Sequence, residues 1–167
     1  MLFRSRRTDL SECFSRSAWR LINSGYERVI EDPNDLDARG AMLLGAHFGG
    51  MAIENSMLGA AHACANPLTI RHGVAHGVAI AVLLPHVVAW NEPVAAARYE
   101  EIYSGDLTAR LRKLSAMAGL PQNLREAGVP EAALPQLAED AATQWSGKFN
   151  PRHFDAVGAL EIYQQAY

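Results

Sequence analysis

Apolar residues recur at steps of three and four positions over most of this chain, and this spacing constrains the fold more than any other feature. In the first such stretch they are Leu10, Phe14, Ala18, Leu21 and Ile22. Residues spaced in this way lie on one face of an α-helix, which buries that face against its neighbours. No convincing alternation of apolar and polar residues, the pattern of a half-buried strand, interrupts it. The sequence therefore predicts an all-α fold, a bundle of about seven helices.

Capping and turn residues predict where the first helix begins and ends. Asp9 or Ser11 can cap its start, because a short oxygen-bearing side chain accepts from free backbone N–H groups there. The Asn-Ser-Gly sequence at 23–25 can loosen or interrupt it, and Pro33 ends it.

The second predicted helix is long and rich in small residues. It begins after Asn34 or Asp35 and ends at Asn66, because the residue before a proline is pushed out of the helical region. Glycine costs up to about 1 kcal/mol against alanine in a helix, so its repeated use favours close backbone packing or a bend. The glycines concerned are Gly40, Gly45, Gly49, Gly50 and Gly59.

The remaining helices follow a predicted loop at 68–75. A buried helix runs from about His76 to Trp90 and is closed by Asn91 and Pro93. Further helices are predicted over Ala95 to Tyr103, Leu107 to Ala118, Glu131 to Ser146 and Phe154 to Gln165.

Length, charge and cysteine content narrow the class of protein. A chain of 167 residues that is 49% hydrophobic fits a single domain over residues 1–167. The formal net charge of -3 offers no basic stripe, so no nucleic-acid partner is expected. Cys13 and Cys64 form no paired framework, which favours a reducing, cytoplasmic location.

The apolar run from Val74 to Trp90 is interrupted and short, so no membrane span is predicted.

Three histidines lie in the sequence "HACANPLTIRHGVAHG" at 62–77. His62 is expected near the end of one helix and His76 at the start of the next, where two imidazoles could form half of a transition-metal site. Two histidines that satisfy local hydrogen bonds are the alternative. His72 is expected to be solvated in the loop, and His86 to be a partly buried helix residue.

The run "GAAHACANPLTIRHGVAHGVAIAVLLPHVVAWN" closely resembles the long signature of the iron-containing alcohol dehydrogenases. In that signature a histidine among small residues precedes a loop, a second histidine-glycine and a helix ending in "LLPHV". Further stretches, including "FSRSAWRLI", "FNPR" and the final "YQQAY", look like parts of the same family's helical C-terminal domain, which has a dehydroquinate synthase-like fold.

The resemblance implies a metal site and a cofactor. His62 and His76 match two of the family's four ligands to Fe²⁺, or sometimes Zn²⁺, fourteen positions apart. NAD(P) would bind against a separate N-terminal α/β domain, and the resemblance places Asn66 near its nicotinamide. The ion would act as a Lewis acid on a small alcohol or aldehyde during hydride transfer.

The chain does not match the whole family pattern. The family's N-terminal nucleotide-binding domain and its other two ligands, an aspartate and a histidine, have no counterpart in these 167 residues, so the metal site is incomplete and the chain alone is expected to be inactive. Asparagine at position 66 can orient a hydroxyl group but cannot act as a base at neutral pH. The alternatives are a non-catalytic helical interaction module, completing a site with a separate nucleotide-binding chain, or a structural remnant. Homo-oligomers are possible.

Overall fold

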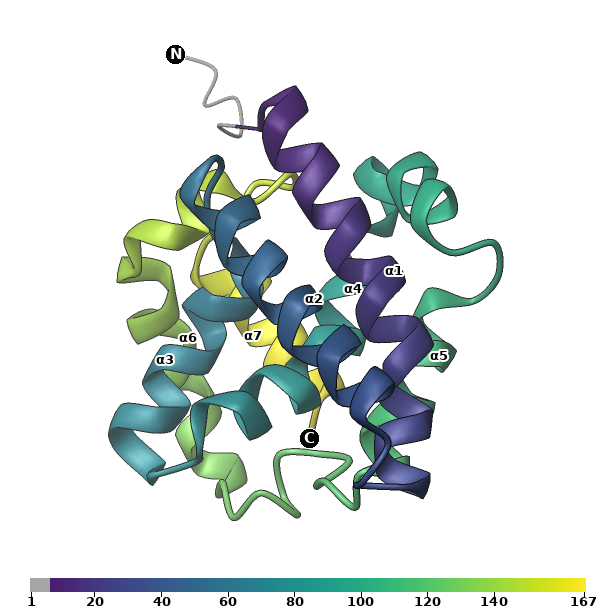
Figure 1. Cartoon of the computed structure of the whole chain (residues 1–167). Helices are drawn as coiled ribbons and strands as arrows, with labels where there is room; N and C mark the ends of the chain where they lie inside the picture. Colours follow the sequence, from purple (N-terminus) through teal and green to yellow (C-terminus); the bar gives the residue numbers. More distant parts are fainter. Residues whose placement is uncertain (1–6) are drawn as a thin grey trace. The chain divides into compact units, whose positions relative to one another are not determined.

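The computed structural model describes residues 7–167, and within this range the chain forms helices and no strand. The all-α prediction is confirmed (Figure 1). The α-helices are α1 (Asp9–Glu31), α2 (Leu36–Glu54), α3 (Ala60–His72), α4 (His76–Ile102), α5 (Leu107–Met117), α6 (Leu134–Thr143) and α7 (Ala156–Gln165), and two short 3-10 helices are η1 (Glu131–Ala133) and η2 (Trp145–Phe149).

The described residues fall into two compact units. The first ends at Met57 and holds the hairpin of α1 and α2, and the second begins at Leu58 and holds α3 to α7. The helices of the second unit carry every residue that the sequence assigned to a metal or cofactor site.

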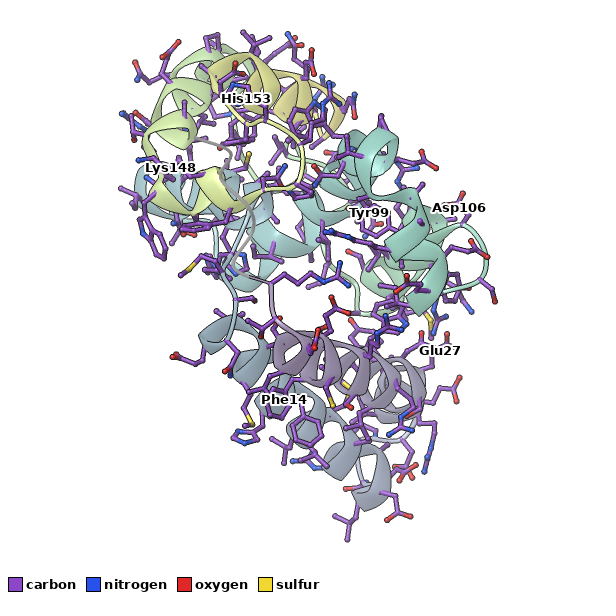
Figure 2. All side chains as sticks on the ribbon, turned by 90° about the horizontal axis from the view of Figure 1, so that it is seen from above. Phe14, Glu27, Tyr99, Asp106, Lys148 and His153 are labelled. Carbon is purple, nitrogen blue, oxygen red and sulfur yellow. The ribbon has the colours of Figure 1, made fainter. Side chains whose placement is uncertain are left out.

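Small residues allow α1 and α2 to approach closely. A Cβ atom added to Gly45 would lie 2.7 Å from Cγ1 of Ile22, and one added to Gly25 would lie 3.0 Å from the carbonyl oxygen of Ala38. Near one end of the hairpin Phe14 packs on Phe48, with ring centroids 5.9 Å apart (Figure 2). Close packing thus explains Gly45, as the sequence predicts, but Gly40, Gly49 and Gly50 have nothing within 4 Å of an added Cβ atom.

The start of α1 differs from the prediction. Its cap is Thr8, whose hydroxyl accepts from the backbone N–H of Ser11 at 3.1 Å, while the Ser11 hydroxyl accepts from the N–H of Thr8 at 3.0 Å. This reciprocal pair satisfies two N–H groups that would otherwise lack partners, so neither Asp9 nor Ser11 is the cap. The helix also runs through 23–25 without a break, because Gly25 is buried against α2.

The boundaries of α3 correct the prediction of one long helix ending at Asn66. The non-helical residues 55–59 separate α2 from α3, and Pro67 lies inside α3. Pro67 removes one backbone hydrogen bond. It is itself buried, and its neighbour Leu68 is fully buried in the hydrophobic core, so burial outweighs that loss. The helix continues to Gly73, whose left-handed backbone (φ 65°) ends it.

Helix α4 is longer than predicted. It continues through Asn91 and Pro93 to Ile102, where two helices were expected. Pro93 is exposed, while Trp90 and Ala95 are buried in the core, so packing on the inner face keeps the helix continuous. By length and composition α4 could cross a membrane, but 50% of its most apolar window is buried inside the fold, as in a core helix.

Helices α3, α4, α6 and α7 share the core of the second unit. Its largest fully buried side chains are Tyr163, Leu68, Leu83, Leu124, Leu137, Ile162 and Cys64. The hydroxyl of Tyr163 on α7 donates to the carbonyl of Cys64 on α3 at 2.6 Å, which fixes α3 on the C-terminal helix.

Candidate metal centre

The two histidines singled out by the sequence lie together. His62 is the third residue of α3 and His76 is the first residue of α4. Their ring centroids are 5.4 Å apart, with the ring planes inclined by 44°. His62 therefore stands at the start of its helix, whereas its predicted place was near the end of one, but the predicted meeting of the two imidazoles occurs.

This separation fits a shared ion. An ion bound at about 2.1 Å to one nitrogen of each ring would lie about 3.2 Å from each ring centre, so at a tetrahedral angle the centres would be about 5.3 Å apart. The observed 5.4 Å agrees with that value. Imidazole nitrogen suits iron, zinc and copper alike, so the pair does not select one metal.

The surroundings favour neutral imidazole at His62. Its side chain is half-buried, and burial lowers its pKa, with a smaller contribution from the charge of His76. Only a neutral imidazole coordinates a metal, because protonation occupies the donor nitrogen. The environment therefore keeps His62 in its ligand form at lower pH than a solvated histidine.

The described residues supply no further ligand. Within residues 7–167 no group of three or more histidine, cysteine, aspartate or glutamate side chains could hold an ion. Cys64, two positions after His62, is buried, and burial raises its pKa to about 12. Its thiol stays protonated at neutral pH, so it is not a ligand. The centre is a pair of imidazoles.

The other histidines have different surroundings. His72 is the last residue of α3 and is partly buried, with Nε2 inaccessible and without a hydrogen-bond partner, so the prediction of a solvated loop residue is wrong. His86 is a partly buried residue of α4, as predicted. His153 is exposed on the loop before α7 (Figure 2).

Asn66 lies four residues after His62 on the same face of α3, because residues four apart in a helix are neighbours on its surface. Its side chain is half-buried, and Nδ2 donates to Oε1 of Gln144 at 3.0 Å. This bond fixes the amide so that Oδ1 is the group able to accept from a bound molecule.

Sequence reasoning did not identify Asn150. Its Oδ1 accepts from the backbone N–H of Ala60, two residues before His62, at 3.2 Å. The two residues are 90 positions apart, and no local pattern pairs an asparagine in a turn with a helix start so distant in the sequence.

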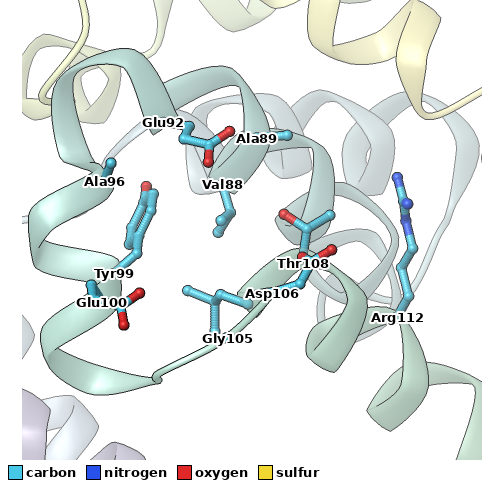
Figure 3. A pocket seen from close by; sticks show the side chains of 11 residues that line it. Val88, Ala89, Glu92, Ala96, Tyr99, Glu100, Gly105, Asp106, Thr108 and Arg112 are labelled. Carbon is cyan, nitrogen blue, oxygen red and sulfur yellow. The ribbon is translucent and has the colours of Figure 1, made fainter.

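A cavity of about 480 Å³ lies elsewhere in the second unit, between the C-terminal half of α4 and the start of α5 (Figure 3). Its polar lining residues are Glu92, Tyr99, Glu100, Asp106, Thr108 and Arg112. None of His62, His76 and Asn66 lines it, so it is separate from the candidate metal centre.

Comparison with known proteins assigns the chain to a family. The family profile described as "Fe-containing alcohol dehydrogenase family, C-terminal" matches residues 2–167. The chain is 34% identical to the 1,3-propanediol dehydrogenase of Citrobacter freundii over 165 residues, covering 90% of this chain and 43% of that protein. It is 30% identical to the lactaldehyde reductase of Escherichia coli (strain K12) over 177 residues, covering 92% and 46%.

Solved structures support the same family assignment. A crystal structure of 1,3-propanediol oxidoreductase matches 96% of this chain with a TM-score of 0.88 and 31% identity, and an alcohol dehydrogenase from Oenococcus oeni matches 96% with a TM-score of 0.90 and 25% identity. In both cases the chain covers 46% of the other protein. The chain thus spans less than half the length of the relatives it matches, and it belongs to the iron-containing alcohol dehydrogenase family, to whose C-terminal domain it corresponds.

Proposed function

We propose that residues 1–167 are the helical, metal-binding domain of a cytoplasmic NAD(P)-dependent dehydrogenase that interconverts a small alcohol and its aldehyde. The observation that carries the proposal is the pairing of His62 and His76, whose ring centroids lie 5.4 Å apart in a chain of this family. Relatives named for 1,3-propanediol and lactaldehyde support a short, oxygen-rich substrate.

Each histidine contributes one imidazole nitrogen to Fe²⁺ or Zn²⁺, and the remaining ligands come from outside these 167 residues. When bound, the ion supplies Lewis acidity that polarises the substrate oxygen. The burial that lowers the pKa of His62 keeps its ring neutral and available. His76 is exposed, so the site is open to solvent and substrate on that side.

Asn66 serves the cofactor side of the site. Its Nδ2 donates to Oε1 of Gln144, which fixes the orientation of the amide and leaves Oδ1 available as an acceptor. A carboxamide has no titratable proton near neutral pH, so Asn66 orients the nicotinamide or a substrate hydroxyl and moves no proton.

The alternative is a helical module that completes a site with a separately encoded nucleotide-binding chain. The absence of a third ligand among the described residues fits this candidate as well as it fits a domain of a longer dehydrogenase. The coding sequence separates the two: a nucleotide-binding domain encoded in the same reading frame supports the domain of one dehydrogenase, and one encoded in a separate adjacent frame supports the module.

Zinc titration of the 167-residue chain by calorimetry tests the proposal. We expect weak binding that is lost in both His62→Ala and His76→Ala, because one imidazole is no chelate. His72→Ala is the control, since His72 lies at the far end of α3, and it should bind zinc as the parent does. Binding that survives both single substitutions, or that falls as much in His72→Ala, would show that the imidazole pair is not the site.

A further inference from the structure

The side chain of Asn150 uses its full hydrogen-bonding capacity to join three segments. Its Oδ1 accepts from the backbone N–H of Ala60 at 3.2 Å and from Nδ2 of Asn91 at 3.2 Å. Its Nδ2 donates to Oδ1 of Asn91 at 2.7 Å and to the carbonyl of Arg152 at 2.8 Å. A carboxamide has two donor hydrogens and one acceptor oxygen with two lone pairs, and all are occupied.

Helix α3 depends on this contact for its cap. The residue before its first turn is Gly59, which has no side chain to accept from the free N–H groups of the helix start. Asn150 supplies an acceptor from a distant part of the chain. A Cβ atom on Gly59 would lie 3.1 Å from Oδ1 of Asn150, so glycine leaves the space that the asparagine needs.

The loop that carries Asn150 is itself fixed on α4. Asn91 is a buried α4 residue, only 3% exposed. Arg152 donates to the carbonyl of Trp90 at 2.7 Å, and its guanidinium lies 4.0 Å from the centre of the Trp90 ring. Two successive residues of α4 therefore hold the loop, and the loop holds the start of α3.

This arrangement links the two histidines. Ala60, which Asn150 binds, precedes His62 by two residues, and Asn91, its other partner, belongs to the helix that begins at His76. We infer that Asn150 is a positioning residue, which fixes the start of α3 against α4 so that the His62 ring faces the His76 ring. The inference rests on the proposed function only in its consequence, that zinc affinity depends on Asn150.

Zinc titration of the full chain is the first part of the test. Loss of groups that orient metal ligands typically weakens binding by a factor of about 10–100, and we expect Asn150→Ala to weaken it by about tenfold. Asn150→Asp keeps an acceptor for the Ala60 N–H but loses the two donors, so its affinity should lie between those of Asn150→Ala and the parent.

Tyr163→Phe is the matched control. It removes another long-range hydrogen bond to α3, at the carbonyl of Cys64, without touching the start of the helix. It should destabilise the chain yet bind zinc as the parent does. Equal weakening in Tyr163→Phe and Asn150→Ala would overturn the inference, because a general loss of stability would then explain both.

The second part needs no metal. Ring protons of His62 and His76 lie close enough for a nuclear Overhauser effect in the parent, since the ring centroids are 5.4 Å apart. We expect this signal to persist in Tyr163→Phe and to vanish in Asn150→Ala while circular dichroism stays helical. Its persistence in Asn150→Ala would overturn the inference.

The two parts separate the inference from the proposed function. If the parent binds zinc no better than His62→Ala, the proposed function fails, and the metal-free signal alone decides the role of Asn150. Should Asn150→Ala fail to fold, Asn150→Asp takes its place: an undiminished ring signal and parental zinc affinity in that variant would overturn the inference.

Discussion

Among single residues, His86 is one whose protonation is coupled to folding. It is partly buried on α4, and burial, followed by the charge of Arg112, lowers its pKa. The folded chain thus binds this proton less tightly than the unfolded chain, in which histidine has a pKa of about 6.5. The contribution of neutral His86 to the free energy of unfolding is complete above that value. It is lost as the pH falls through the pKa of His86 in the folded chain. His62, whose pKa is lowered as well, acts in the same direction.

We therefore expect the free energy of unfolding to decrease as the pH falls below about 6.5, and to decrease less steeply in His86→Gln. Urea denaturation between pH 5 and pH 8 measures both slopes. A slope for His86→Gln equal to that of the parent would contradict the assignment.

Residues of the candidate site differ in how far the sequence identifies them. His62, His76 and Asn66 are predicted from a resemblance carried by one continuous stretch, and their roles stay predictions. The structure places the ring centroids of His62 and His76 5.4 Å apart. Asn150 and Asn91 act through contacts 59 and 90 positions apart in the chain. Such pairs depend on the tertiary fold, and an asparagine in a turn looks the same whether or not it caps a distant helix.

At the scale of helices, the end of α3 is set by Gly73. Its φ of 65° and ψ of 15° place it in the left-handed region, and its N–H donates to the carbonyl of Thr69 at 3.2 Å. A side chain in that region costs about 1–2 kcal/mol. We expect Gly73→Ala to lower the free energy of unfolding by about 1 kcal/mol, and Gly73→Asn to lower it less, because asparagine tolerates this conformation.

Urea denaturation at neutral pH measures these changes. Gly77→Ala is the matched control: Gly77 lies in the first turn of α4, has no positive φ, and an added Cβ atom meets nothing within 4 Å. It should leave stability unchanged or raise it slightly. An alanine at position 73 that is tolerated as well as one at position 77 would show that the left-handed turn does not set the end of α3.

The helices show where reading a sequence succeeds and where it fails. Periodicity predicts the existence of nearly every helix, because the buried face is a local pattern. The helix ends predicted from proline are wrong at Pro67 and Pro93, which lie inside α3 and α4. A proline costs one hydrogen bond and some strain, whereas the core contacts of Leu68 or Trp90 come from helices far along the chain, and that balance is not visible locally.

For the whole molecule, the decisive quantity is how much of an active site these 167 residues supply. The chain covers 43% of the 1,3-propanediol dehydrogenase it resembles and places two imidazoles, without a third ligand among the described residues, at the candidate centre. Hydride transfer requires the reacting atoms to be held about 3–3.5 Å apart. We expect a polypeptide of these residues, given Zn²⁺ or Fe²⁺, NAD(P)⁺ and 1,3-propanediol, to show no turnover above that of His62→Ala.

Absorbance of the reduced nicotinamide at 340 nm follows this reaction. The intact 1,3-propanediol dehydrogenase is the positive control under the same conditions. Metal-dependent cofactor reduction by the 167 residues alone would refute the expectation and show that they contain a complete site.

Because Cys64 is buried, the rate at which its thiol is alkylated measures how often α3 moves away from the core. The thiol is fully inaccessible, and burial raises its pKa to about 12, whereas Cys13 is exposed. Alkylating reagents attack the thiolate, so iodoacetamide can modify Cys64 only during moments when α3 separates from the core. Because His62 and Asn66 flank Cys64 on the same helix, its alkylation rate relative to that of Cys13 reports how often the candidate metal site comes apart.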